Sequence, residues 1–216
     1  YVITFVPSTL EITQANLTVT ATSGLSKVYG EIDPTLTYSI TGFVNSDAES
    51  DLDIGVTISR VAGETVGDYT ITPSEAADSN YVITFVPSTL EITQANLTVT
   101  GLVVNNKEYD GTTEATTLGT PVLSGVISND NVVLDASPVF TFESPEVGTN
   151  ITITNAGFTI AGTNNENYTL TQPFLSADIT QRAITLTASL QEKNYGNILV
   201  LDDTAFTVTD LDNDAV

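Results

Sequence analysis

The sequence contains no cysteine, histidine, methionine or tryptophan, and these absences narrow its chemistry. Without cysteine, neither a disulfide nor a thiolate metal site is available, and without histidine the chain lacks the commonest general base and metal ligand. No catalytic triad, cysteine nucleophile or glycine-rich phosphate loop is present, so we predict that the chain is not an enzyme. Carboxylates are so common that chance pairs of them do not indicate a glycosidase.

Positive charge is almost as scarce. The 216 residues include 5 basic and 27 acidic side chains, which gives a net charge of −22. Such a chain repels phosphate backbones and anionic lipid surfaces, so we expect no nucleic-acid partner. No apolar run is long enough to span a bilayer, and we predict no membrane insertion. A secretory signal is not visible, but because Tyr1 lies inside a repeat this says nothing about export.

The most informative feature that is present is a perfect repeat. Residues 1–20 and 81–100 share the sequence YVITFVPSTLEITQANLTVT, and a weaker Ile-Thr-Gln echo recurs at residues 12–14, 92–94 and 179–181. Identical copies at a domain-sized spacing indicate tandem duplication. We therefore divide the chain into the closing strand of a preceding repeat (1–14), two complete repeats (15–94 and 95–181) and the incomplete start of a further repeat (182–216).

Within each repeat, apolar and polar residues alternate with a period of two along segments rich in Thr, Val, Ile and aromatic residues. This predicts strands and no helix longer than about three turns. In one of them, Tyr81, Ile83 and Phe85 share a face, and Pro87 separates this strand from the next. Many short strands in a unit of this size predict an all-β fold of tandem antiparallel, Ig-like β-sandwiches arranged end to end. Only Gln94-Ala95-Asn96 joins the two complete repeats, which favours a stiff junction.

A short motif recurs once in every repeat. Lys27-Val28-Tyr29-Gly30 returns as Lys107-Glu108-Tyr109-Asp110-Gly111 and as Lys193-Asn194-Tyr195-Gly196, which uses all three lysines of the chain. An Asn-Tyr pair stands near the end of each complete repeat, as Asn80-Tyr81 and Asn167-Tyr168.

Together with Asp33-Pro34 and Val66-Gly67-Asp68-Tyr69 in the first repeat and Leu123-Ser124-Gly125 in the second, these motifs resemble tandem MBG (YGX-type) and YDG-type repeats of very large bacterial surface proteins. The resemblance implies an extracellular location on the bacterial cell surface, in the stalk of an adhesin or of a gliding or filament-forming protein. Segment 197–201 departs from the pattern, because it stands where the Asp33-Pro34 segment is expected.

The Lys-x-Tyr motif has two interpretations. The one that we favour is a strand-to-turn transition in which the ring packs and the lysine stem covers it. The other is an intramolecular amide crosslink, Lys27 to Asn80 and Lys107 to Asn167, which requires a desolvated neutral lysine near a protonated carboxylic acid.

Two acidic runs are candidate Ca²⁺ ligands, because alternate residues of an extended segment face one way and carboxylates are hard oxygen ligands. They comprise Asp47, Glu49, Asp51 and Asp53, and Asp210, Asp212 and Asp214. Neither run fits the EF-hand loop. We favour the simpler interpretation of solvated acidic loops, and we predict no other cofactor.

These observations predict a structural stalk or spacer that holds a binding tip away from the cell. Its partners would be adjacent repeats of the same chain and neighbouring copies in a filament. The alternative is a lectin-like module that binds extracellular polysaccharide through exposed Tyr or Phe rings. Most of the 16 Tyr and Phe residues lie at core-like positions or in the recurring turn, which favours the spacer.

Overall fold

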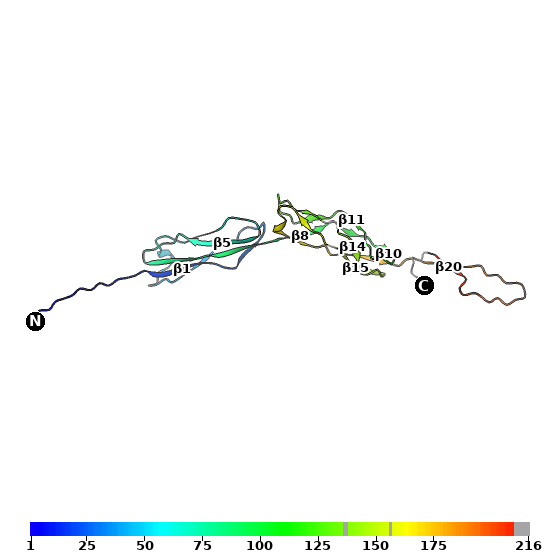
Figure 1. Ribbon diagram of the computed structural model, residues 1–216, viewed down its shortest axis with the longest axis horizontal. Helices are drawn as coiled ribbons and strands as arrows, with labels where there is room; N and C mark the ends of the chain where they lie inside the picture. Colours follow the sequence, from blue (N-terminus) through cyan, green and yellow to red (C-terminus); the bar gives the residue numbers. More distant parts are fainter. Residues whose placement is uncertain (136–137, 156, 210–216) are drawn as a thin grey trace. The chain divides into compact units, whose positions relative to one another are not determined.

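The computed structural model describes residues 1–135, 138–155 and 157–209, and it confirms the prediction of an all-β chain (Figure 1). Contacts divide the chain into two compact units. The first unit comprises residues 1–96, 127–130 and 163–169, and the second comprises residues 97–126, 131–162 and 170–216. Among the described residues, helical structure is limited to two 3-10 turns, η1 (Glu49–Asp51) and η2 (Asn165–Asn167), and no helix could cross a membrane.

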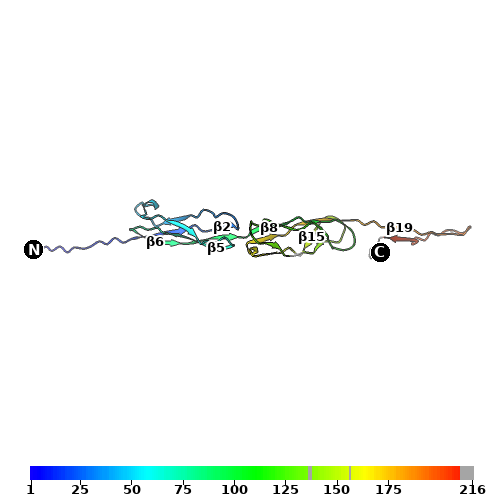
Figure 2. The same ribbon diagram turned by 90° about the horizontal axis from the view of Figure 1, so that it is seen from above.

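The first unit holds two sheets, some of whose strands are labelled in Figure 2. One has the order β3-β1-β6 and the other the order β2-β7-β5-β4. The strands are β1 (Ala15–Ala21), β2 (Leu25–Val28), β3 (Tyr38–Thr41), β4 (Thr57–Arg60), β5 (Gly67–Ser74), β6 (Tyr81–Val86) and β7 (Ser88–Thr93). As the sequence predicted, Pro87 lies between β6 and β7, and these two strands belong to different sheets.

The first and last strands of this unit run in the same direction, which corrects the expectation of purely antiparallel sheets. Strand β1 pairs with β6 in parallel from Ala15↔Tyr81 to Thr20↔Val86, and β2 pairs with β7 in parallel from Leu25↔Leu90 to Val28↔Thr93. The remaining pairs in the unit are antiparallel. Period-two patterning could not reveal this, because it fixes which face a side chain occupies and not the direction of the neighbouring strand.

The inward-facing residues of the strands, at every second position, form the core of the first unit. Leu17 and Val19 on β1 and Ile71 on β5 are fully buried, as are Leu90 and Ile92 on β7 to within one per cent. Ala21, Ile71 and Leu90 form one cluster, against which partly buried neighbours such as Tyr69 pack. The intervening polar residues of these strands are partly or fully exposed, which is the pattern of a half-buried sheet.

The second unit has more and shorter strands, and two of them, β8 and β17, begin with residues that belong to the first unit. Its sheets have the orders β10-β18-β15-β14, β11-β9, β12-β8-β17 and β13-β16. The strands are β8 (Ala95–Thr100), β9 (Val103–Val104), β10 (Lys107–Glu108), β11 (Thr117–Leu118), β12 (Val122–Ser124), β13 (Val133–Leu134), β14 (Phe140–Phe142), β15 (Gly148–Asn155), β16 (Ile160–Ala161), β17 (Tyr168–Thr171) and β18 (Leu175–Thr180). As in the first unit, a strand that carries the recurring lysine, β10, pairs in parallel with the closing strand β18.

Aromatic side chains dominate the core of the second unit. Phe140, Phe142 and Phe158 are buried with Ile153 and Ile179 in a single cluster. Rings bury a large area per residue, and this suits a unit in which many of the strands are only two or three residues long.

The two ends of the chain differ from the complete repeats. Residues 1–14 form no strand, and their apolar side chains are exposed, Phe5 to 89% (Figure 1). The assignment of residues 1–14 to a preceding repeat stays a prediction. Near the other end, β19 (Thr185–Ala188) and β20 (Phe206–Thr209) form an antiparallel hairpin.

Candidate functional site

The recurring lysine of the first repeat lies on a strand with its side chain buried. Lys27 is on β2, on the same face as Leu25, and is only 7% exposed. The strand ends at a turn in which Gly30 has φ +83°, in the left-handed region that favours glycine. The Lys27 ammonium donates to the carbonyl of Glu31 beyond this glycine, at 3.0 Å. One role of the lysine is therefore to close the turn.

Lys27 also belongs to a charge network of four residues, which we call the lysine network: Lys27, Asp33, Arg60 and Glu64. The Lys27 Nζ atom lies 2.8 Å from Asp33 Oδ1 and donates to Glu64. Arg60 bridges the same two carboxylates, with Nε 2.5 Å from Asp33 Oδ2 and Nη2 2.5 Å from Glu64 Oε1. Each cation therefore meets both anions, and the network ties the turn after β2 to the loop between β4 and β5.

The network keeps its members ionised. Hydrogen bonds from Arg60 and Lys27 lower the pKa of Asp33 to about 2, and hydrogen bonds from Lys27 and Arg60 lower the pKa of Glu64. Burial by itself lowers the pKa of Lys27, but the hydrogen bonds to Asp33 and Glu64 outweigh burial and raise that pKa. A lysine held in its protonated form is not a nucleophile at neutral pH.

The second and third lysines of the motif make local contacts. Lys107 Nζ lies 2.7 Å from Asp110 Oδ1 and 2.8 Å from the carbonyl of Thr112, both within the same turn. The hydrogen bond from Lys107 contributes most to lowering the pKa of Asp110 to about 2. Lys193 donates to the carbonyl of Asn197 at 3.4 Å. In all three turns the ammonium reaches a carbonyl that follows the glycine.

The structure does not bring Lys27 and Asn80 together. Lys27 pairs in register with Ile92 near the end of β7, whereas Asn80 directly precedes Tyr81, the first residue of β6. The members of the second predicted pair are assigned to different units. Lys107 belongs to the second unit, and Asn167 belongs to the first unit, where its Oδ1 atom accepts a hydrogen bond from the amide of Val66 at 3.0 Å.

The first acidic run is dispersed over separate partners. Asp47 accepts from the Tyr81 hydroxyl at 2.6 Å, Glu49 accepts from the Tyr38 hydroxyl, and Asp51 and Asp53 accept from the amides of Ala48 and Ser79. The turn η1 breaks the extended geometry that would align them. Among the described residues no three acidic side chains are grouped as a metal site, and Asp210, Asp212 and Asp214 lie outside the described residues.

A tyrosine cluster that the sequence did not reveal lies in the first unit and joins Tyr29 to residues 127–130 and 163–169. The hydroxyls of Tyr29 and Tyr168 both donate to Asp130 Oδ2, at 2.9 and 2.5 Å, and their rings meet edge to face with centroids 5.4 Å apart. The amide of Ile127 donates to the Tyr168 hydroxyl at 3.0 Å. Burial, followed by the hydrogen bond to Asp130, raises the pKa of Tyr168 to about 12, and the same causes raise the pKa of Tyr29.

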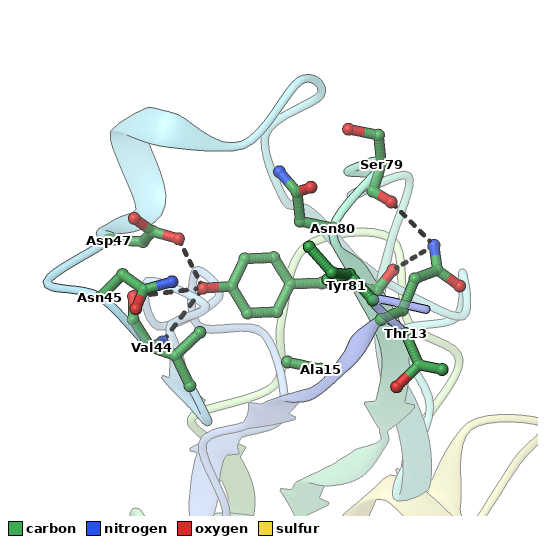
Figure 3. Close-up of a pocket in the computed structure, with 10 residues that line it drawn as sticks. Thr13, Ala15, Val44, Asn45, Asp47, Ser79, Asn80 and Tyr81 are labelled. Atoms are coloured by element: carbon green, nitrogen blue, oxygen red, sulfur yellow. Dashed lines mark hydrogen bonds between the residues drawn. The ribbon is translucent and has the colours of Figure 1, made fainter. Parts of the chain in front are cut away.

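A pocket of about 400 Å³ surrounds the other Asn-Tyr pair, Asn80-Tyr81 (Figure 3). The Tyr81 hydroxyl points toward Asp47 and Val44, and it accepts from the amide of Val44 at 3.0 Å while it donates to Asp47. The hydrogen bond to Asp47 is the main reason that the pKa of Tyr81 is raised. The pocket is lined by Ile12, Thr13, Gln14, Ala15, Val44, Asn45, Asp47, Ser79, Asn80 and Tyr81.

The buried polar side chains of these sites are hydrogen-bonded within the protein. In the described part of the chain, every buried side-chain nitrogen or oxygen has a hydrogen-bond partner. The missed residues Asp33, Arg60 and Glu64 had one signal in the sequence, the scarcity of basic residues, because Arg60 is one of only two arginines.

Two domain families match successive parts of the chain. Residues 17–91 match the family model of the MBG domain (YGX type), and residues 93–175 match that of the YDG domain. No curated protein matches the chain.

Proposed function

We propose that this chain is a load-bearing spacer in the stalk of a very large secreted bacterial surface adhesin or filament, where it holds a binding tip away from the cell. The tandem of a YGX-type and a YDG domain supports this proposal through its resemblance to the repeats of such proteins. The finer architecture that we propose is a series of Ig-like sandwiches.

The observation that carries the proposal is the parallel pairing of the terminal strands in the first unit. The chain enters this unit along β1 and β2 and leaves it along β6 and β7, which run beside them in register. A segment from Ala15 to Val28 at 3.3 Å per residue separates the entry and exit points by roughly 40 Å. Tension between these points loads the evenly spaced hydrogen bonds of the parallel ladder together, in shear, and not one after another.

Side-chain chemistry agrees with a mechanical role. The lysine network holds the turn after β2 to the neighbouring loop, close to the end of the ladder where Val28 pairs with Thr93. The rings of Tyr81 and Tyr168 are buried and hydrogen-bonded, which leaves them no free face for a sugar.

Single-molecule pulling along two directions tests the proposal, and the absence of natural cysteines allows the attachment points to be chosen. Asn16→Cys with Glu91→Cys loads the ladder in shear, whereas Asn16→Cys with Val82→Cys pulls apart a directly paired position and unzips it. We expect severalfold higher unfolding forces in shear, because forced unfolding is governed by the barrier along the pulling direction. Equal forces in the two geometries would contradict a load-bearing role, provided that denaturant shows equal stability of the two variants.

A further inference from the structure

Both complete repeats contain the same small structure, which we call the tyrosine socket. In one, the Tyr81 hydroxyl accepts from the amide of Val44 at 3.0 Å and donates to Asp47 Oδ2 at 2.6 Å. In the other, the Tyr168 hydroxyl accepts from Ile127 at 3.0 Å and donates to Asp130 Oδ2 at 2.5 Å. All of these residues belong to the first unit.

The loops that form the two sockets contain the same backbone hydrogen bond. The amide of Asp47 donates to the carbonyl of Val44 at 3.0 Å, and the amide of Asp130 donates to the carbonyl of Ile127 at 3.1 Å. Both turns pass through the left-handed region, at Asn45 and Ser46 in one and at Asn129 in the other.

A glutamine binds the rim of each socket in the same way. Gln14 donates to the carbonyls of Ser79 and Tyr81. Gln94 donates to the carbonyls of Glu166 and Tyr168. Gln14 and Gln94 end identical fourteen-residue segments, 1–14 and 81–94, so each socket is entered from the same stretch of sequence.

The Tyr168 socket is occupied, and its occupant is the Lys-x-Tyr-Gly turn of the first repeat. Tyr29 donates to Asp130, packs edge to face on Tyr168 and hydrogen-bonds with the Asn167 side chain. Asn167 also accepts from the amide of Val66, and it is 5% exposed as a result of this cover. At Gly30 a side chain would meet Ile127, because a Cβ atom there would lie 2.2 Å from Ile127 Cδ1.

In the described part of the chain, the Tyr81 socket presents the same groups and no Lys-x-Tyr-Gly turn covers them. Asn80, the counterpart of Asn167, is exposed, and Val44, the counterpart of Ile127, is 46% exposed. Three residues of the segment 1–14 line the pocket beside them, namely Ile12, Thr13 and Gln14.

The register of the first repeat identifies what belongs there. Strand β2 pairs Lys27 with Ile92, and the amide of Tyr29 donates to the carbonyl of Thr93 at 2.8 Å. A β2 strand that paired in the same way with residues 10–13 would place its lysine beside Ile12 and its tyrosine amide beside Thr13, at the mouth of the pocket.

We propose that the Tyr81 socket binds the Lys-x-Tyr-Gly turn of another YGX-type repeat, the repeat that residues 1–14 close, with the tyrosine hydroxyl donating to Asp47. The YGX-type repeat is thus a receptor at one end and a ligand at the other. The proposal rests on the geometry of the two sockets and does not depend on a load-bearing role.

The identity of residues 1–14 and 81–94 permits a direct test. A second copy of residues 15–80, placed ahead of Tyr1, adds one complete repeat with no foreign sequence. Val66→Cys in the added copy is combined with Asn80→Cys in the original copy. This pair reproduces the contact of Val66 with Asn167, and its rate of disulfide formation reports docking. Val66→Cys with Asn167→Cys in the original chain calibrates this rate. The matched control keeps Val66→Cys in the added copy and pairs it with Thr84→Cys, at an exposed position of the original copy, in place of Asn80→Cys.

We expect the Asn80→Cys pair to crosslink within one molecule roughly tenfold faster than the control pair, because docking holds the two positions together. Tyr29→Phe in the added copy removes only the hydroxyl and should slow crosslinking severalfold, whereas Tyr29→Phe in the original copy should not. A rate no higher than that of the control, or one that is insensitive to the added Tyr29, would overturn the proposal. Crosslinked dimers in place of the intramolecular product would overturn it in favour of a second chain as the occupant. A positive result combined with equal pulling forces would leave docking intact and reject only the mechanical role.

Discussion

The lysines of the two complete repeats occupy the same place in the same motif, yet they are held differently. Lys27 has its carboxylate partners at Asp33 and Glu64, which lie beyond its own turn, and it shares them with Arg60. The hydrogen-bond partners of Lys107 lie within five residues, at Asp110 and Thr112, and its ammonium also lies 5.6 Å from the centre of the Phe142 ring. The side chain of Lys27 is 3% exposed and that of Lys107 is 18% exposed.

This difference separates a tertiary contact from a local one. A contact between distant residues forms only when the unit is folded, so it contributes to the free energy of unfolding. A contact within one turn persists in part in the unfolded chain, and its net contribution is smaller. The charged hydrogen bonds of the motif therefore stabilise the whole unit in the first repeat and mainly a turn in the second.

Replacing each lysine by methionine should give the largest contrast. We expect Lys27→Met to lower the free energy of unfolding of the first unit by about 2–3 kcal/mol, because hydrogen bonds to charged groups are lost from a buried site. Lys107→Met should cost the second unit less than about 1 kcal/mol, as for a local ion pair. Urea unfolding followed by NMR signals from each unit measures both values, and equal losses would refute the distinction.

Lowering the pH should reveal a smaller difference in stability between the two units. The pKa of Asp33 is about 2 in the folded unit against an ordinary value of 3.8. A lowered folded-state pKa stabilises above pH 3.8, and this contribution is lost as the pH falls from about 4 to 2. Asp33→Asn should flatten that part of the stability profile of the first unit. Asp110→Asn should flatten the same part of the stability profile of the second unit only, because the pKa of Asp110 is also about 2.

The control for this experiment is the overall charge. Acid also relieves the self-repulsion of a chain with a net charge of −22, and this effect is common to the wild type and both variants. Differences between each variant and the wild type therefore isolate the two aspartates. If Asp33→Asn altered the acid profile of the second unit, the division of the contacts into two units would be wrong.

An exposed member of the lysine network should matter less than its centre. The Glu64 side chain is 64% exposed, and Arg60 and Lys27 both keep Asp33 as a partner when Glu64 is neutralised. We expect Glu64→Gln to cost less than about 1 kcal/mol and to become neutral in high salt, as exposed ion pairs do. A loss as large as that of Lys27→Met would show that the network is stabilised as one unit and not by its buried lysine.

Calcium should have the smallest effect of all. Each carboxylate of the first acidic run has its own protein partner, so the described structure gathers no ligand set for the ion. We expect the melting temperature of the first unit to be the same with calcium and with chelator, because an ion that does not bind the folded state cannot stabilise it. A rise with calcium that Asp47→Asn or Asp53→Asn abolished would restore the metal site.

Much of the fold could be predicted because a strand with one buried face alternates apolar and polar residues along the sequence. The strand that holds Tyr81, Ile83 and Phe85 was predicted in this way, and Pro87 marked a break that the structure contains. Strand β2 was not visible, because a lysine stands at its inward-facing position and hides the period of two. The two-residue strand β10 carries too few residues to show any period.

The sequence by itself determined the all-β class, the repeat spacing and the place of the recurring Lys-x-Tyr turn, since each depends on residues that are neighbours along the chain. Only the tertiary structure decided that β1 and β2 run parallel to β6 and β7, that Lys27 meets Asp33 and Glu64, and that Tyr29 meets Asp130. These facts depend on partners up to 101 positions apart. A single sequence specifies the chemical groups available for such contacts, but the packing of the folded chain selects which of them meet.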